Sequence, residues 1–149
     1  MKYRYLLIDN DNTLMDFHAA EQAALRETLT EAGIEPTDAV CARYSAINDA
    51  LWKALERGET THAALKIARF AQLLAEYPAE NVCAPRLALR YSHYLGTHAD
   101  LMPGAEAFLR RLHGQMKIVL VSNGDSVIQR NRLFRCVFTP LLDNIVISS

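Results

Sequence analysis

The chain has 149 residues, of which half are hydrophobic and 22% are charged. This length suits one ordinary domain, and the hydrophobic content excludes a disordered or low-complexity protein. The formal net charge is −1, so the chain lacks the basic excess that neutralises a run of phosphates, and we expect no binding to a nucleic-acid polymer. No apolar run approaches the ~18–20 residues that span a membrane, and the first residues do not form a signal peptide, so we expect a cytoplasmic protein without membrane contact.

The first predicted element is a short buried strand at Tyr5–Ile8, which runs directly into the polar pentapeptide Asp9–Thr13. Helical patterns occupy most of the next part of the chain. Their expected bounds are 19–32, 38–77 with a break at the Gly58 turn and a new N-cap at the following threonines, and 85–95. This helical block is too long for a crossover helix, so we interpret residues 16–98 as an inserted helical cap.

The remaining part of the chain alternates helices with apolar strands. We expect helices at 105–113 and 126–134, and strands at 117–121 and 144–147. Helices between apolar strands imply a parallel sheet with right-handed crossovers. The predicted fold class is therefore α/β: an incomplete Rossmann-like parallel sheet of about three strands, formed by residues 1–15 and 99–149, with the helical cap at 16–98.

The pentapeptide after the first strand carries the main candidate catalytic residues, Asp9 and Asp11. Ligands of open α/β sheets collect at the carboxyl ends of the strands. Two carboxylates two residues apart lie ~6–7 Å from each other in an extended chain, so one can stay ionised while its neighbour carries a proton, which suits a nucleophile beside a general acid/base. Their oxygen atoms also suit Mg²⁺. The alternative is an ordinary turn capped by aspartate and asparagine side chains.

A second polar constellation, Ser122–Gly124, follows the second apolar strand. Its hydroxyl, its main-chain N–H groups and a glycine at the entry to a helix form a small cradle for an anion. Taken alone, these residues favour an ordinary strand-to-helix turn capped by serine or asparagine.

Two further groups of residues receive ordinary structural interpretations. We expect Arg130, Arg132 and Arg135 on the solvated face of a helix. The cysteines have no C-x-x-C spacing and no neighbouring histidine cluster, which argues against a disulfide framework or a zinc site. We therefore expect three buried or half-buried thiols, at Cys41, Cys83 and Cys136.

Together the two polar constellations resemble the motifs of the haloacid dehalogenase-like (HAD) hydrolase superfamily. Residues 6–14 are similar to its first motif, a hydrophobic strand followed by D-x-D-x-T, and residues 119–124 are similar to its second, a strand that ends in Ser or Thr. The helical insertion is similar to a C1-type cap. Within it, residues 48–52, 58–61 and 65–70 resemble the subgroup of pyrimidine and noncanonical 5′-nucleotidases.

The resemblance implies an Mg²⁺-dependent phosphatase that forms an aspartyl-phosphate and takes a small phosphate ester, most simply a nucleoside 5′-monophosphate. Asp9 would attack phosphorus, and Asp11 would protonate the leaving oxygen and then activate water. Mg²⁺ would be held by Asp9 and Asp11. The implied phosphate-binding residues are Asn10, Thr13, Ser122, Asn123 and Gly124. The implied substrate-binding residues of the cap are Asn48, Trp52 and Arg69, although Trp52 at helical spacing from other apolar residues also suits the cap core.

The chain departs from the family pattern after its third predicted strand. That pattern continues with a lysine and then with an acidic pair on a further strand, whereas the last lysine here is Lys117. We therefore expect a chain truncated at its C-terminus, whose first strand becomes a sheet edge open to self-association. The alternatives to a nucleotidase are a catalytically silent fragment and a sugar-phosphate phosphatase or phosphomutase.

Overall fold

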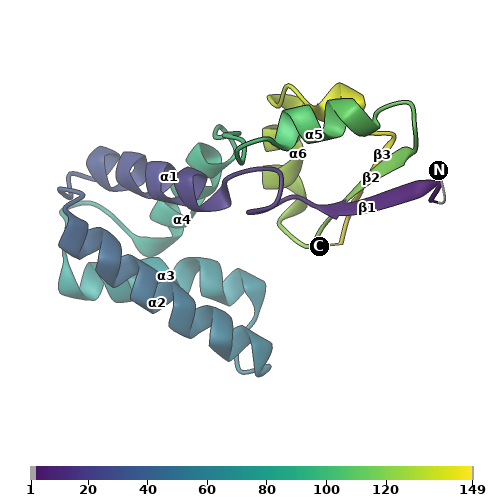
Figure 1. Cartoon of the computed structure of the whole chain (residues 1–149). Coiled ribbons are helices and arrows are strands. Elements are labelled where there is room, and N and C mark those ends of the chain that lie inside the picture. The colour runs from purple at the N-terminus through teal and green to yellow at the C-terminus, as the bar shows by residue number, and fades with distance from the viewer. Residues whose placement is uncertain (1–2, 149) are drawn as a thin grey trace. The chain divides into compact units, whose positions relative to one another are not determined.

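The computed structural model describes residues 3–148, which form three strands, six α-helices and one short 3-10 helix (Figure 1). The elements in chain order are β1 (Tyr5–Asp9), α1 (Phe17–Glu31), α2 (Asp38–Glu56), α3 (His62–Glu76), α4 (Ala84–Leu95), α5 (Ala105–Leu112), β2 (Lys117–Ser122), α6 (Ser126–Phe134), η1 (Thr139–Leu141) and β3 (Asn144–Ile147). Every predicted strand and helix is present, with ends that differ by at most a few residues, and only η1 was not predicted. The α/β fold class is confirmed.

The chain divides into two compact units. One consists of Met1–Glu21 together with Leu95–Ser149, and the other of Gln22–Tyr94. The first unit contains the sheet, and the second contains most of α1 and the helices α2, α3 and α4. We call them the sheet unit and the helical unit.

The three strands of the sheet unit are parallel, in the order β1-β2-β3. Alternate residues of β2, Ile118 and Leu120, are fully buried in a cluster with Leu109 of α5 and Leu133 of α6. Because side chains alternate along a strand, the residues between them point to the opposite face. The core of this unit therefore lies on the α5 and α6 side of the sheet.

The opposite face of the sheet is open to solvent. Leu7 is 69% exposed, and Tyr5, Val121 and Val146 on the same face are also exposed. The prediction of buried strands is therefore wrong for this face of the sheet, because α5 and α6 pack against the other face. Within the described part of the chain, β1 is also the outer strand and pairs with β2 alone. Self-association through this edge stays a prediction, since an exposed apolar edge favours pairing but does not demonstrate it.

The helical unit is built around three aromatic side chains, Tyr44, Phe70 and Tyr91, each at most 1% exposed. The ring centroids of Tyr44 and Phe70 lie 5.4 Å apart, and those of Phe70 and Tyr91 lie 5.5 Å apart. Such tilted ring pairs add to the free energy gained by burying their area. The break predicted between α2 and α3 is present, because Gly58 has a φ of 73° and the Thr61 hydroxyl accepts a hydrogen bond from Ala64 N at 3.2 Å.

Two of the three cysteines are buried as predicted, and one is not. Cys41 and Cys136 are buried free thiols, and burial raises the pKa of both. Cys83 is a free thiol exposed to solvent, so its predicted burial is wrong. It lies in the loop immediately before α4 and is not part of the helix. Among residues 3–148, no helix is long and apolar enough to cross a membrane.

Asp143, just before β3, ties that strand to β2. Its carboxylate accepts a hydrogen bond from Ile118 N at 2.8 Å and from Lys117 Nζ at 2.9 Å. The main-chain N–H of Ile118 and then the ammonium group of Lys117 hold the pKa of the Asp143 carboxyl below its ordinary value.

We expect this carboxylate to stabilise the fold in a pH-dependent way. Because the pKa is lowered in the folded state, the carboxylate's contribution to stability is fully present above the ordinary aspartate pKa of ~3.9. That contribution is lost as the pH falls through the folded-state pKa. The variant Asp143→Asn should therefore unfold at a lower urea concentration than the parent at pH 7. This difference in urea concentration should shrink progressively as the pH is lowered from 4. A difference that stays constant at low pH would show that the carboxylate charge is not responsible.

Candidate active site

The acidic pentapeptide and the Ser122 constellation lie at the same edge of the sheet. Asp9, the last residue of β1, is in register with Val121 of β2. Ser122 is the next residue of β2 and its last. Because the strands are parallel, both polar loops leave the sheet at its carboxyl end. The structure thus brings together two sets of residues that lie more than 100 positions apart in the sequence.

The loop after β1 is a tight, hydrogen-bonded turn. The main-chain carbonyl of Asn10 accepts hydrogen bonds from the N–H groups of Thr13, Leu14 and Met15 at 2.9–3.2 Å. Asn12 has a φ of 58°, a left-handed conformation that asparagine tolerates well. The turn leaves Asp9 exposed, with its Oδ2 atom accepting a hydrogen bond from Thr13 Oγ1 at 3.3 Å.

The two other side chains at the start of this loop point into the protein. Asn10 is fully buried, and its Nδ2 donates to Gln129 Oε1 at 2.9 Å. Asp11 accepts two hydrogen bonds from α6, one from Arg132 Nη1 to Oδ1 at 2.6 Å and one from Gln129 Nε2 to Oδ2 at 2.5 Å. Asp9 and Asp11 therefore have different surroundings, one facing solvent and the other held by a buried guanidinium group.

Arg132 corrects the expectation of a solvated helix face. Its side chain is 0% exposed, whereas Arg130 and Arg135 are exposed as predicted. The inward face of α6 consists of Gln129, Arg132 and Leu133, which follow the helical spacing of i, i+3 and i+4. That spacing, continued by the buried Cys136, was the available indication that this arginine points inward.

The constellation after β2 forms a compact turn into α6. Ser122 is 2% exposed, and its hydroxyl accepts a hydrogen bond from Gly124 N at 3.2 Å, which leaves the hydroxyl proton to be donated elsewhere. A Cβ atom at Gly124 would lie 2.5 Å from Gln129 Nε2, so any other residue there would displace the Gln129 side chain. Asp125 caps α6 by accepting from the N–H groups of two residues of its first turn. Asn123 is exposed at this corner.

The three substrate-binding candidates of the helical unit have different positions. Arg69 and Asn48 are 7% and 8% exposed, and Arg69 Nη1 donates to Asn48 Oδ1 at 3.2 Å. The Arg69 guanidinium carbon lies 4.6 Å from the centroid of the Tyr91 ring, within range of a cation–π interaction. Trp52 is 42% exposed and meets the His62 ring edge-on at 5.6 Å, so it does not belong to the buried core. The structure therefore brings Asn48 and Arg69 together in the interior and leaves Trp52 at the surface.

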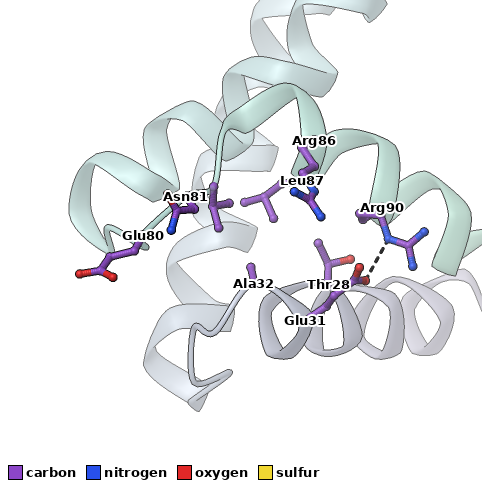
Figure 2. Close-up of a pocket in the computed structure, with 9 residues that line it drawn as sticks. Thr28, Glu31, Ala32, Glu80, Asn81, Arg86, Leu87 and Arg90 are labelled. Carbon is purple, nitrogen blue, oxygen red and sulfur yellow. Dashed lines mark hydrogen bonds and ion pairs between the residues drawn. The ribbon is translucent and has the colours of Figure 1, made fainter.

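A separate hollow in the helical unit lies between α1 and α4, with a volume of about 210 Å³ (Figure 2). Its lining includes Thr28, Glu31, Arg86 and Arg90 but none of the residues predicted for the site. Glu31 accepts hydrogen bonds from Tyr94 Oη at 2.7 Å and from Arg90 Nε at 2.9 Å, and these donors hold the pKa of its carboxyl below the ordinary value. The hollow is thus lined by charges that compensate one another.

No family model matches the chain, but curated proteins do. It is 36% identical over 147 residues to the HAD-hydrolase YfnB of Bacillus subtilis, and 34% identical over 149 residues to the pyrimidine 5′-nucleotidase PynA of Streptococcus pneumoniae. Each comparison covers 99% of this chain. The crystal structure of YfnB bound to magnesium superimposes with a TM-score of 0.92 at 35% identity, covering 99% of this chain and 64% of that one.

The chain is similar to HAD-like hydrolases over 99% of its length and shares their fold. The resemblance that the two motifs suggested is confirmed, together with the HAD-like fold. A β-phosphoglucomutase structure from Thermotoga maritima, 14% identical with a TM-score of 0.72, shows the same fold alone. The chain spans 62% of the length of YfnB and PynA.

Proposed function

We propose that this chain carries the reaction centre of a phosphomonoester hydrolase whose substrate is a nucleoside 5′-monophosphate. The observation that carries the proposal is the meeting of the Asp9–Thr13 loop and Ser122 at the carboxyl edge of one parallel sheet. The similarity to a protein named as a pyrimidine 5′-nucleotidase supports the nucleotide as substrate.

In the proposed reaction, Asp9 is the nucleophile. It is the exposed carboxylate of the pair, and the Thr13 hydroxyl limits its rotation. A carboxylate oxygen of Asp9 forms a bond to phosphorus while the bond from phosphorus to the leaving oxygen breaks, which gives an aspartyl-phosphate and the nucleoside. Asp11 gives a proton to the leaving oxygen and then takes one from the water that hydrolyses the aspartyl-phosphate.

The phosphoryl oxygens would be held at the edge of the sheet where the two loops meet. The Ser122 hydroxyl has a proton to donate, and Gly124 follows two residues later with its main-chain N–H bonded to that hydroxyl. Main-chain N–H groups near Asn10 and Asn123, with the Thr13 side chain, complete the proposed phosphate-binding set.

The residues present fit Mg²⁺ through one carboxylate and one main-chain carbonyl. Among the residues described, no group of three or more His, Cys, Asp or Glu side chains is placed to hold a metal. Mg²⁺ needs only one or two protein carboxylates when water and substrate phosphate complete its shell. The exposed Asp9 carboxylate meets that need, whereas the Asp11 carboxylate is engaged by α6 and leaves its main-chain carbonyl as the second donor. When bound, the ion would neutralise charge on the phosphate.

We further propose that residues 16–98, which include the helical unit, serve as a cap that selects the substrate. Trp52 offers an exposed aromatic surface of the kind on which a base stacks. The buried pair of Asn48 and Arg69 would support that surface from the interior of the unit.

The decisive experiment is to incubate the purified chain with uridine 5′-monophosphate, with glucose 6-phosphate or with neither, in Mg²⁺ and in EDTA. We expect inorganic phosphate to be released from the nucleotide in Mg²⁺ only, and the melting temperature to rise when both are present, because a ligand at 100 times its Kd stabilises by about 2.7 kcal/mol. Faster release from the sugar phosphate would favour the alternative substrate. If no phosphate is released and the melting temperature does not rise, the chain is catalytically silent.

A further inference from the structure

The side chain of Arg132 is a buried cation held on three sides within the sheet unit. Its Nη1 atom lies 2.6 Å from Asp11 Oδ1, its Nε donates to the carbonyl of His98 at 2.9 Å, and its guanidinium carbon lies 5.5 Å from the centroid of the Phe17 ring. Removing a guanidinium group from water is costly unless such partners replace the water. The loss of any one partner would leave the charge under-compensated, so this arginine has one well-defined position.

Gln129 has a fixed orientation for a related reason. Its Oε1 atom accepts from Asn10 Nδ2 at 2.9 Å and lies 3.4 Å from Arg132 Nη1, and both of those groups are donors only. The oxygen of the amide must therefore face them, and the NH₂ group must face Asp11. Gly124 lets this side chain approach the loop after β2, because a larger residue there would collide with Nε2.

These two side chains, three residues apart on one face of α6, contact both oxygens of a single carboxylate. The Asp11 side chain is itself 25% exposed, so without them it would sample other solvated rotamers. A buried ion pair contributes little net stability compared with apolar packing of the same volume. Stability alone therefore does not explain why an arginine is buried here. A need to hold the Asp11 carboxylate in one orientation explains it.

We infer that Arg132 and Gln129 are positioning residues, which fix the Asp11 carboxylate in one orientation two residues beyond the proposed nucleophile. This inference rests on the proposed function, because it gives Asp11 its acid and base steps. Arg132 acts through Asp11 and contacts neither the substrate nor the metal. Misplacing a reacting group by about 1 Å costs about 100-fold in rate, which sets the size of the effect.

The kinetic test compares Arg132→Met, Arg132→Lys and Gln129→Leu with Arg130→Met, the matched control on the exposed side of the same helix. With p-nitrophenyl phosphate and Mg²⁺, Arg132→Met should lower kcat about 100-fold with KM little changed, and Arg132→Lys should restore part of the loss. Rates are normalised to the folded fraction from circular dichroism. An Arg132→Met variant that folds and keeps its kcat would overturn the inference.

A second measurement needs no activity. In the chain without Mg²⁺ or substrate, the side-chain amide resonances of Gln129 should move in Asp11→Asn and in Arg132→Met. Those of Gln115, whose Nε2 donates to the Arg111 carbonyl at 2.6 Å, should stay in place as the control. Gln129 resonances that move in neither variant would refute the proposed arrangement even in an active chain. A parent chain that hydrolyses no ester refutes the proposed function, and the amide resonances then decide separately whether Asp11 is held.

Discussion

Replacing Asp9 with asparagine is expected to abolish phosphate release from p-nitrophenyl phosphate. An amide cannot form the acyl phosphate on which the proposed reaction depends, and loss of a covalent nucleophile lowers kcat by about 10⁶-fold. The substitution preserves the shape of the side chain, and its remaining oxygen can still accept the hydrogen bond from the Thr13 hydroxyl. Because Asp9 is exposed, the fold should be unaffected.

The matched control is Asp100→Asn, which removes another exposed carboxylate from the same unit. Both variants should melt at the temperature of the parent, and Asp100→Asn should keep its turnover. Undiminished turnover in Asp9→Asn would remove Asp9 from the role of nucleophile, and would leave the acidic loop as a structural turn.

The elements of this fold could be predicted because each has a strong local pattern. The strand Asn144–Ile147 contains three consecutive apolar residues between polar ones. The break at Gly58 requires a residue that adopts a left-handed backbone conformation. Asp9 and Ser122 could be proposed together because both follow apolar strands, and parallel strands end at one edge. These inferences depend on neighbours in sequence.

What could not be predicted depends on tertiary neighbours. An apolar run such as β1 does not reveal whether one face or both faces will be covered, so the exposure of Leu7 was missed. A charged residue is solvated by default, so Arg132 was assigned to the surface although its spacing matches the buried side of α6. Its partner Asp11 lies 121 positions away, and no local pattern links the two.

The largest effect on stability is expected at Phe138. This side chain is fully buried in the cluster that joins α5, α6 and β2, and truncating a buried phenylalanine to alanine costs about 3–5 kcal/mol. Phe134, four residues earlier, is 87% exposed, so Phe134→Ala should change the free energy of unfolding by less than about 0.5 kcal/mol. Urea unfolding followed by far-ultraviolet circular dichroism measures both. Equal effects in the two variants would contradict the burial of Phe138.

The same pair of variants tests whether the two units unfold together. Trp52 is the single tryptophan of the chain and belongs to the helical unit, whereas Phe138 belongs to the sheet unit. Tryptophan fluorescence therefore follows one unit, and circular dichroism follows both. Two cooperative units would give a Phe138→Ala variant in which the circular dichroism transition moves to lower urea while the fluorescence transition does not. If both transitions move equally, the stability of the helical unit depends on the core of the sheet unit.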